Sequence, residues 1–171
     1  MTTTAATGIT APAGFRAAGV TAGLKASGGR DVALVVNDGP SKAAAAVFTR
    51  NRVAAAPVHW SRQVMSDGRA DAVFLNSGGA NACTGPQGFQ NTHATAEKVA
   101  DLLGISAGDV LVCSTGLIGE QLPMDKILPG AEAAAAALDA DGGALAAEAI
   151  MTTDTVSNQA VFTGSGYSIG G

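Results

Sequence analysis

Charged side chains are scarce in this 171-residue sequence. They make up 14% of the residues, whereas about 25% is usual for a globular chain. The net charge is −4, and the ten Lys and Arg residues are scattered along the chain. Nucleic acids and anionic membranes are bound through clustered basic residues, so the sequence predicts neither kind of partner. The shortage of charge also predicts a buried surface larger than that of one monomer.

Long apolar segments and targeting signals are also missing. No apolar run approaches the roughly 20 residues that span a bilayer. The first residues, MTTTAATG, lack the basic start and apolar stretch of a signal peptide. The expected location is therefore the cytoplasm.

Cysteine and histidine are too few to suggest a metal site. Cys83 and Cys113 cannot build a disulfide framework, and neither stands at a metal-ligand spacing from His59 or His93. We expect both cysteines to be small buried residues. His59 is expected on an amphipathic helix, and His93 is expected as a surface or capping group. No metal and no cofactor are predicted.

Well-known catalytic motifs are absent as well. The sequence contains no G-x-S-x-G elbow, no phosphate-binding G-x-x-x-x-G-K-[ST] loop, no C-x-x-C pair and no H-E-x-x-H helix. Gly164, Ser165, Gly166 and Gly170 have the wrong spacing for a dinucleotide fingerprint.

Short apolar runs and helical patterns alternate along the chain. Strands are predicted over 31–37, 44–49, 71–76, 109–114 and 160–163. Helices are predicted over 57–65, 88–103, 124–138 and 143–151, with Pro129-Gly130 interrupting the third and Gly104 ending the second. The alternation predicts one α/β domain over residues 1–171, with helices packed on a layered sheet.

Glycine-rich loops are expected at two strand ends, over 76–82 and 114–119. Glycine lets backbone N–H groups approach a ligand, because it has no Cβ and tolerates unusual φ and ψ angles. An oxyanion hole needs such fixed donors. Thr115 can offer its hydroxyl or N–H group and Gly116 its N–H group, although a tight turn after a strand accounts for the same residues.

Consecutive hydroxyl groups form the third feature of interest. Thr152 and Thr153 stand at the end of a predicted helix, in the run Met151-Thr152-Thr153-Asp154-Thr155. Their hydroxyls can bind a small zwitterion, or they can cap the next element.

Taken together, the motifs resemble those of the ornithine acetyltransferase (ArgJ) family, the bifunctional glutamate N-acetyltransferases of arginine biosynthesis. The resemblance covers about residues 8–155. It rests on five motifs in order, AVFTRNRVAAAPV, LNSGGANACTG, STGLIG, LPMDKI and IMTTDT.

The resemblance implies an enzyme of two chains cut from one precursor. Members of the family cleave themselves before a threonine, and the new N-terminal Thr of the β chain is the nucleophile. This sequence is similar to the α chain, so its α/β fold is expected to be completed by the β chain. In that family the Thr-Gly of STG forms the oxyanion hole, here Thr115 and Gly116. A threonine of TTD binds substrate, here Thr152 or Thr153, and we favour Thr152.

Two departures from the family pattern stand out. The Lys-Gly stretch and the Ala-Thr cleavage point of the family are not found in these residues, so the substrate-binding lysine and the nucleophile are expected on other residues. Gly79 stands where many relatives have Asn, and we assign no catalytic role to Asn81.

The implied reaction moves acetyl from N2-acetyl-L-ornithine to L-glutamate through an acetyl-threonine. Some relatives also accept acetyl-coenzyme A as donor, and α2β2 assembly is typical of the family. One alternative is a subunit of an N-terminal-nucleophile amidohydrolase or aminopeptidase, in which water accepts the acyl group. Another is a ligand-binding domain without catalysis.

Overall fold

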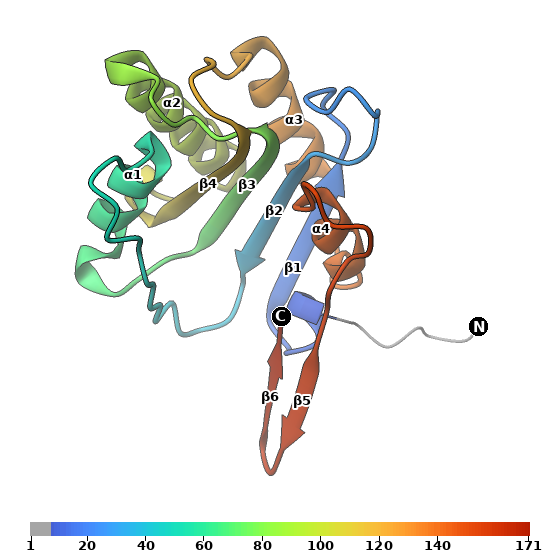
Figure 1. The fold of residues 1–171 in the computed structure, drawn as a ribbon. Coiled ribbons are helices and arrows are strands. Elements are labelled where there is room, and N and C mark those ends of the chain that lie inside the picture. The colour runs from blue at the N-terminus through green and yellow to red at the C-terminus, as the bar shows by residue number, and fades with distance from the viewer. Residues whose placement is uncertain (1–7) are drawn as a thin grey trace.

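The computed structural model describes residues 8–171, and the N-terminal residues 1–7, which bear on the signal-peptide prediction, lie outside it. Within the described residues, a four-stranded sheet has the order β1-β2-β3-β4 (Figure 1). Its strands are β1 Phe15–Val20, β2 Val32–Asn37, β3 Ala72–Gly79 and β4 Val110–Leu117. β2 is antiparallel to β1 and β3, whereas β3 and β4 are parallel. The carboxyl ends of β3 and β4 therefore lie side by side.

Helices α1 Ala56–Val64, α2 Gly85–Leu103 and α3 Met124–Ala136 pack on one face of this sheet. Side chains along a strand alternate between the two faces, so Leu34 of β2 and Phe74 of β3 point into this layer, where both are fully buried. The main core joins these strand residues to Trp60, Val99 and Ile127 of the three helices. Because β3 and β4 are parallel, α2 provides the long crossover that such a pair requires.

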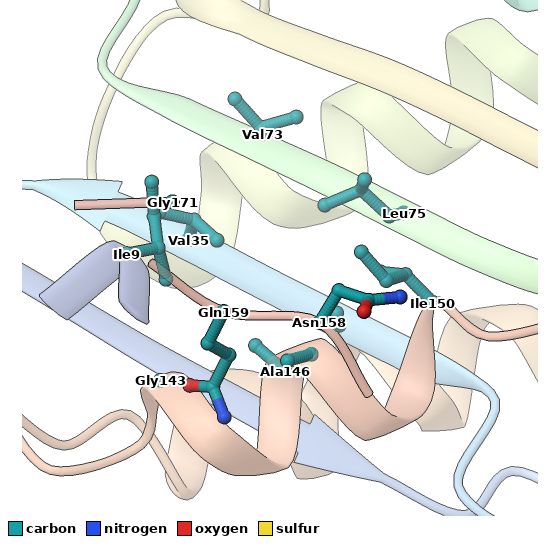
Figure 2. Close-up of a pocket in the computed structure, with 12 residues that line it drawn as sticks. Ile9, Val35, Val73, Leu75, Gly143, Ala146, Ile150, Asn158, Gln159 and Gly171 are labelled. Atoms are coloured by element: carbon teal, nitrogen blue, oxygen red, sulfur yellow. The ribbon is translucent and has the colours of Figure 1, made fainter. Parts of the chain in front are cut away.

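Helix α4, Gly143–Ala149, packs on the other face against β1 and β2. The approach is so close that a Cβ on Gly19 would stand 1.9 Å from the carbonyl oxygen of Leu145. α4 leaves much of the face uncovered. Val35, Val73 and Leu75 remain partly exposed and line an apolar groove of about 300 Å³ beside α4 (Figure 2).

Strands β5 Val161–Gly164 and β6 Tyr167–Gly170 form a separate antiparallel hairpin. It extends away from the sheet in Figure 1 and exposes Phe162 and Tyr167, whose rings pack on each other. Short 3-10 turns complete the described elements: η1 Gly8–Thr10, η2 Met65–Asp67 and η3 Ala107–Asp109. None of the helices in residues 8–171 has the length and apolar character to cross a bilayer.

The predicted α/β class is confirmed, and several helix ends agree with the sequence pattern. α1 begins one residue before the predicted start and has Pro57 in its first turn. α2 begins at Gly85 rather than residue 88 and ends at Gly104, whose φ of 68° is left-handed. Glycine adopts that conformation without strain, and this is why it ends helices.

Two element predictions are wrong. Residues 44–49 form no strand, because no sheet edge receives them, and Val47 is almost fully exposed. Pro129 does not interrupt α3, which loses one helical hydrogen bond there and continues. Gly130 keeps the helix close to the sheet, since a Cβ on it would lie 2.8 Å from the Cβ of Ala22.

The sequence pattern also misplaced several strands and both cysteines. Neither β1 nor β6 was among the predicted strands. β3 continues through Gly79 and β4 through Leu117, so both expected loops begin inside the sheet. Cys83 and Cys113 are exposed rather than buried, because Cys83 lies in a loop and Cys113 points to the face of the sheet that α1 to α3 do not cover.

Candidate functional site

One cleft contains all four residues that the sequence motifs single out. Thr115 and Gly116 come from the end of β4, and Thr152 and Thr153 come from the segment after α4. The cleft has a volume of about 600 Å³. The other residues that line it are Leu24, Lys25, Ala26, Ser27, Gly78 and Leu117. All four of these residues, Thr115, Gly116, Thr152 and Thr153, are exposed to solvent.

The backbone at the ends of β3 and β4 is unusually close-packed. Gly78 and Gly116 are neighbours in the parallel register, with φ angles of 111° and 134°. Residues other than glycine rarely adopt φ angles in this region. A Cβ on Gly116 would stand 2.5 Å from the carbonyl carbon of Gly78 and 2.6 Å from the nitrogen of Gly79. Glycine at 116 is therefore required both by its φ angle and by the space available.

Asn76 links the two strand ends from the side of the helix layer. Its side chain is 2% exposed. Ser114 donates its hydroxyl proton to Asn76 Oδ1 at 2.6 Å, and Asn76 Nδ2 donates to the carbonyl of Gly79 at 3.1 Å. One side chain is thus hydrogen-bonded both to the residue before Thr115 and to Gly79, whose nitrogen lies beside Gly116.

The ends of β3 and β4 form one wall of the cleft, and the loop with Leu24 to Ser27 forms a second. Asp31, whose side chain is fully buried, holds this loop. Its carboxylate accepts hydrogen bonds from the backbone N–H groups of Ala22 at 2.6 Å, Leu24 at 2.5 Å and Lys25 at 3.1 Å. A buried carboxylate is stable only with such donors. Asp31 therefore fixes the loop that supplies Leu24 to Ser27.

The third wall is the segment after α4 that carries Thr152 and Thr153. The carbonyl oxygen of Ala149, at the end of α4, links it to the other two walls. It accepts hydrogen bonds from Ser77 Oγ at 2.6 Å and from Lys25 Nζ at 3.4 Å. Ser77 in turn donates its N–H to the carbonyl of Asp31 at 2.9 Å. These contacts place the segment that carries Thr152 beside Gly78.

The segment after α4 is irregular from residue 151 to residue 160. The N–H of Thr152 donates to Asp154 Oδ2 at 3.3 Å. The next regular element is strand β5, so no helix begins where these threonines could cap it. Of the two alternatives for Thr152 and Thr153, the position in the cleft favours ligand binding.

Other residues considered from the sequence lie outside the cleft. Asn81 is fully buried and structural: its Nδ2 donates to the carbonyl of Gly88 at 2.8 Å and to Thr92 Oγ1 at 2.9 Å. His59 is exposed on α1. His93, also exposed, packs its ring on Trp60 and lies 3.5 Å from Glu97.

The cleft contains hydrogen-bond donors and no base. Among its described lining residues there is no histidine and no carboxylate, and Lys25 is the single charged side chain. Residues 8–171 also contain no cluster of three or more His, Cys, Asp or Glu side chains suited to a metal ion. This arrangement can bind an amino acid and stabilise an oxyanion, but the described residues supply no activated nucleophile.

Sequence reasoning missed Asp31 and Asn76. The sequence does mark both of them, because each is a polar residue at one end of an apolar strand segment. Asn76 follows Ala72 and Phe74 at spacing two, on the face that points into the core. A polar side chain at a core-facing position needs partners, and the partners of Asn76 are next in sequence to residues that line the cleft.

The family model of ArgJ matches residues 16–171. Curated relatives named arginine biosynthesis bifunctional protein ArgJ, from Streptomyces coelicolor and Thermobifida fusca, are 65% and 63% identical over 163 residues. Each match covers 95% of this chain and 43% of the relative. The chain therefore spans less than half the length of these curated relatives.

Two solved structures have the same fold. An ornithine acetyltransferase from Mycobacterium tuberculosis, crystallised with ornithine, has a TM-score of 0.95 at 57% identity, with 96% of this chain and 90% of that chain covered. The bifunctional ArgJ protein of Bacillus halodurans has a TM-score of 0.86 at 34% identity, with 96% and 87% covered. The sheet-and-helix layers are those of these proteins. With the family model matching almost all of its described residues, the chain belongs to the ArgJ family.

Proposed function

We propose that this chain is the α chain of a two-chain glutamate N-acetyltransferase of arginine biosynthesis. The enzyme moves an acetyl group from N2-acetyl-L-ornithine to L-glutamate. One observation carries the proposal: Thr115 and Gly116 share a single cleft with Thr152 and Thr153, and the described lining of that cleft has no base. The names of the relatives, including an ornithine acetyltransferase crystallised with ornithine, support the same activity.

The first half-reaction acetylates a threonine of the partner chain. The hydroxyl of the N-terminal Thr of the β chain attacks the acetyl carbonyl, and its proton passes to the α-amine of the same residue. The Thr115 hydroxyl or N–H and the Gly116 N–H donate hydrogen bonds to the oxyanion that forms. The intermediate then collapses: the C–N bond breaks, the proton returns to the departing nitrogen, and ornithine leaves.

The second half-reaction reverses these steps with a different amine. The amino group of glutamate attacks the carbonyl of the acetyl-threonine, and a second oxyanion forms at the same donors. Collapse breaks the ester bond and returns the proton to the threonine hydroxyl. One oxyanion hole serves both steps. Ornithine leaves before glutamate attacks the acetyl-threonine, so ping-pong kinetics are expected.

Thr152 and Thr153 bind the amino-acid part of the substrates. Both substrates carry a carboxylate and a chain with further polar groups, which hydroxyl and backbone N–H donors recognise. Thr152 is the favoured contact, as in the family motif. Acetyl-coenzyme A is proposed as a second acetyl donor used as a substrate, with no bound cofactor.

The β chain packs on the uncovered apolar face of the sheet. In the β3–β4 register Val73 pairs with Leu111, Leu75 with Cys113 and Ser77 with Thr115. Side chains two residues apart point to the same face, so Thr115 lies on the same face as Val73 and Leu75. A partner seated over the groove of Figure 2 would lie on the same face of the sheet as Thr115. Assembly to α2β2 in the cytoplasm completes the proposal.

The test uses enzyme expressed from the full-length coding sequence. Intact-mass spectrometry is expected to find a second polypeptide that begins with Thr. Acetylornithine and glutamate together should give acetylglutamate and ornithine, and acetyl-coenzyme A with glutamate tests the second donor. Acetate release that is independent of glutamate would instead indicate a hydrolase and contradict the proposal.

A further inference from the structure

We infer that Asn76 and Ser114 form a positioning pair that holds the oxyanion donors Thr115 and Gly116 in place. The inference rests on the proposed function and extends it to two residues that do not line the cleft. Neither residue is expected to contact substrate, so both act through the backbone next to them.

The pair occupies the last positions before the donors. Asn76 of β3 and Ser114 of β4 are partners in the parallel register, one step before Ser77 and Thr115 and two before Gly78 and Gly116. Ser114 Oγ lies 2.6 Å from Asn76 Oδ1. The position of Ser114 sets where the chain delivers Thr115, because the two residues share a peptide bond.

The other half of the Asn76 amide binds Gly79, one of the two residues that lie against Gly116. Asn76 Nδ2 donates to the carbonyl of Gly79 at 3.1 Å. Gly79 also contributes its nitrogen to the Gly78–Gly79 peptide, which a Cβ on Gly116 would strike. One planar amide is therefore hydrogen-bonded to Ser114, in the strand before the proposed Gly116 donor, and to Gly79, the residue whose nitrogen lies beside Gly116.

The location of Asn76 is difficult to explain by packing alone. It lies at a core-facing position of β3 and is 2% exposed, where an amide is costly unless it is hydrogen-bonded. In residues 8–171 no other side-chain hydrogen bond reaches Ser114 or the carbonyl of Gly79. Gly78, Gly79 and Gly116 have no side chains, so they cannot themselves supply side-chain hydrogen bonds to hold this strand end.

A positioning role predicts a specific kinetic effect. Oxyanion donors act only when they are fixed at hydrogen-bond distance from the developing charge, and small displacements of catalytic groups cause large losses of rate. Substrate binding by Thr152 and Thr153 does not involve the pair. Loss of the pair should therefore lower the rate constants of both half-reactions by the same factor. kcat then falls by that factor, and both Michaelis constants stay unchanged.

The deciding variant is Ser114→Ala in the assembled enzyme. It removes one hydroxyl from a half-buried site and keeps the Asn76 bond to Gly79. The matched control is Ser61→Ala, since Ser61 Oγ donates to the carbonyl of Val112 at 2.8 Å and accepts from its N–H at 3.1 Å. That serine contacts the same strand two residues earlier, on the α1 side and outside the cleft. Ser114→Thr retains the hydroxyl and tests rescue, and Asn76→Ala tests the pair from its other side.

We expect Ser114→Ala to reduce the rate constants of acetylornithine cleavage and of transfer to glutamate by about 10-fold each. Both Michaelis constants should stay within about twofold of the parent values. Ser114→Thr should recover most of the rate, and Ser61→Ala should change the melting temperature but not kcat. A Ser114→Ala enzyme as active as Ser61→Ala would overturn the inference while the proposed function stands. A parent enzyme without acetyl transfer would overturn the proposed function and this inference with it. If Asn76→Ala does not fold, Ser114→Ala alone decides.

Discussion

Gly116 lies directly against Gly78, its neighbour in the β3–β4 register, with room for a hydrogen atom and no more. Gly116→Ala would combine that collision with a φ of 134°, so we expect the free energy of unfolding to fall by about 1–3 kcal/mol and acetyl transfer to be lost. Thermal unfolding and turnover measure the two effects.

Gly119→Ala is the matched control for this change. Gly119 also has a positive φ, 89°, but a Cβ at this position would meet no heavy atom within 4 Å. The Gly119→Ala variant should therefore lose stability through backbone strain but keep its turnover. Equal turnover losses in both variants would refute the specific role of the Gly78 contact.

Thr115→Ala tests whether the side chain of Thr115 is an oxyanion donor. Removal of one such donor costs about 10²-fold or more in kcat, so a loss of that size with little change in Michaelis constant is expected. Thr115→Ser keeps the hydroxyl and should remain within a few-fold of the parent. Unchanged turnover in Thr115→Ala would leave only backbone donors at this position.

Substrate binding by the Thr152 segment is tested with three alanine variants. Thr152→Ala is expected to raise the Michaelis constant for acetylornithine about 10-fold, the usual size for a lost hydrogen bond to a charged group. Thr153→Ala should have a smaller effect. Thr155, exposed and outside the lining of the cleft, provides the control, and an effect of Thr155→Ala equal to that of Thr152→Ala would contradict the assignment.

Assembly on the uncovered sheet face is tested with Val73→Lys. Val73 lines the apolar groove, so a charge there should be tolerated by the exposed α chain but costly once a partner buries it. The yield of cleaved, assembled enzyme should fall several-fold, as measured by gel filtration with intact-mass analysis. Leu102→Lys is the control, because Leu102 is 40% exposed on α2 in the opposite layer. Equal yields would place the partner elsewhere.

Stability at low pH should depend on the ion pair between Arg16 and Asp38. Their bond, 2.5 Å between Nε and Oδ2, lowers the pKa of the Asp38 carboxyl below its ordinary value. A lowered pKa in the folded state stabilises the protein above the ordinary pKa of Asp, and this contribution is lost as the pH falls through the lower one. Both side chains are about two-fifths exposed, so solvent screening limits the effect to about 1 kcal/mol or less.

Asp38→Asn should therefore unfold at a slightly lower denaturant concentration than the parent at pH 7. The two proteins should converge as the pH falls below the lowered pKa of Asp38. A difference that stays constant over this range would show that the ion pair is not its source.

The sequence predicted the class of the fold and most of its helices because those signals are local. Apolar periodicity marks α1, α2 and the buried strands β2, β3 and β4, and Gly104 ends α2 by its own backbone preference. β1 was missed because FRAAGV contains too few large apolar residues to show a pattern. Pro129 was misjudged because the effect of proline depends on what the rest of the helix packs against.

The candidate site divides in the same way. The motifs alone identified Thr115, Gly116, Thr152 and Thr153, since a resemblance in sequence carries residue identities with it. They did not reveal that these residues share one cleft, or that Asp31 and Asn76 hold its walls. Those facts depend on strand register and on hydrogen bonds between residues 38 positions apart, as for Asn76 and Ser114, or 72 apart, as for Ser77 and Ala149.

By itself, the order of residues determined which chemistry this protein can offer: backbone and hydroxyl donors, few charges, and a sheet with helices. Only the tertiary structure decided where those donors meet and which face of the sheet stays uncovered. The physical reason is that the alternation of side chains along a strand depends on local backbone geometry. Which strand lies next to it depends on packing between residues that are far apart in the sequence.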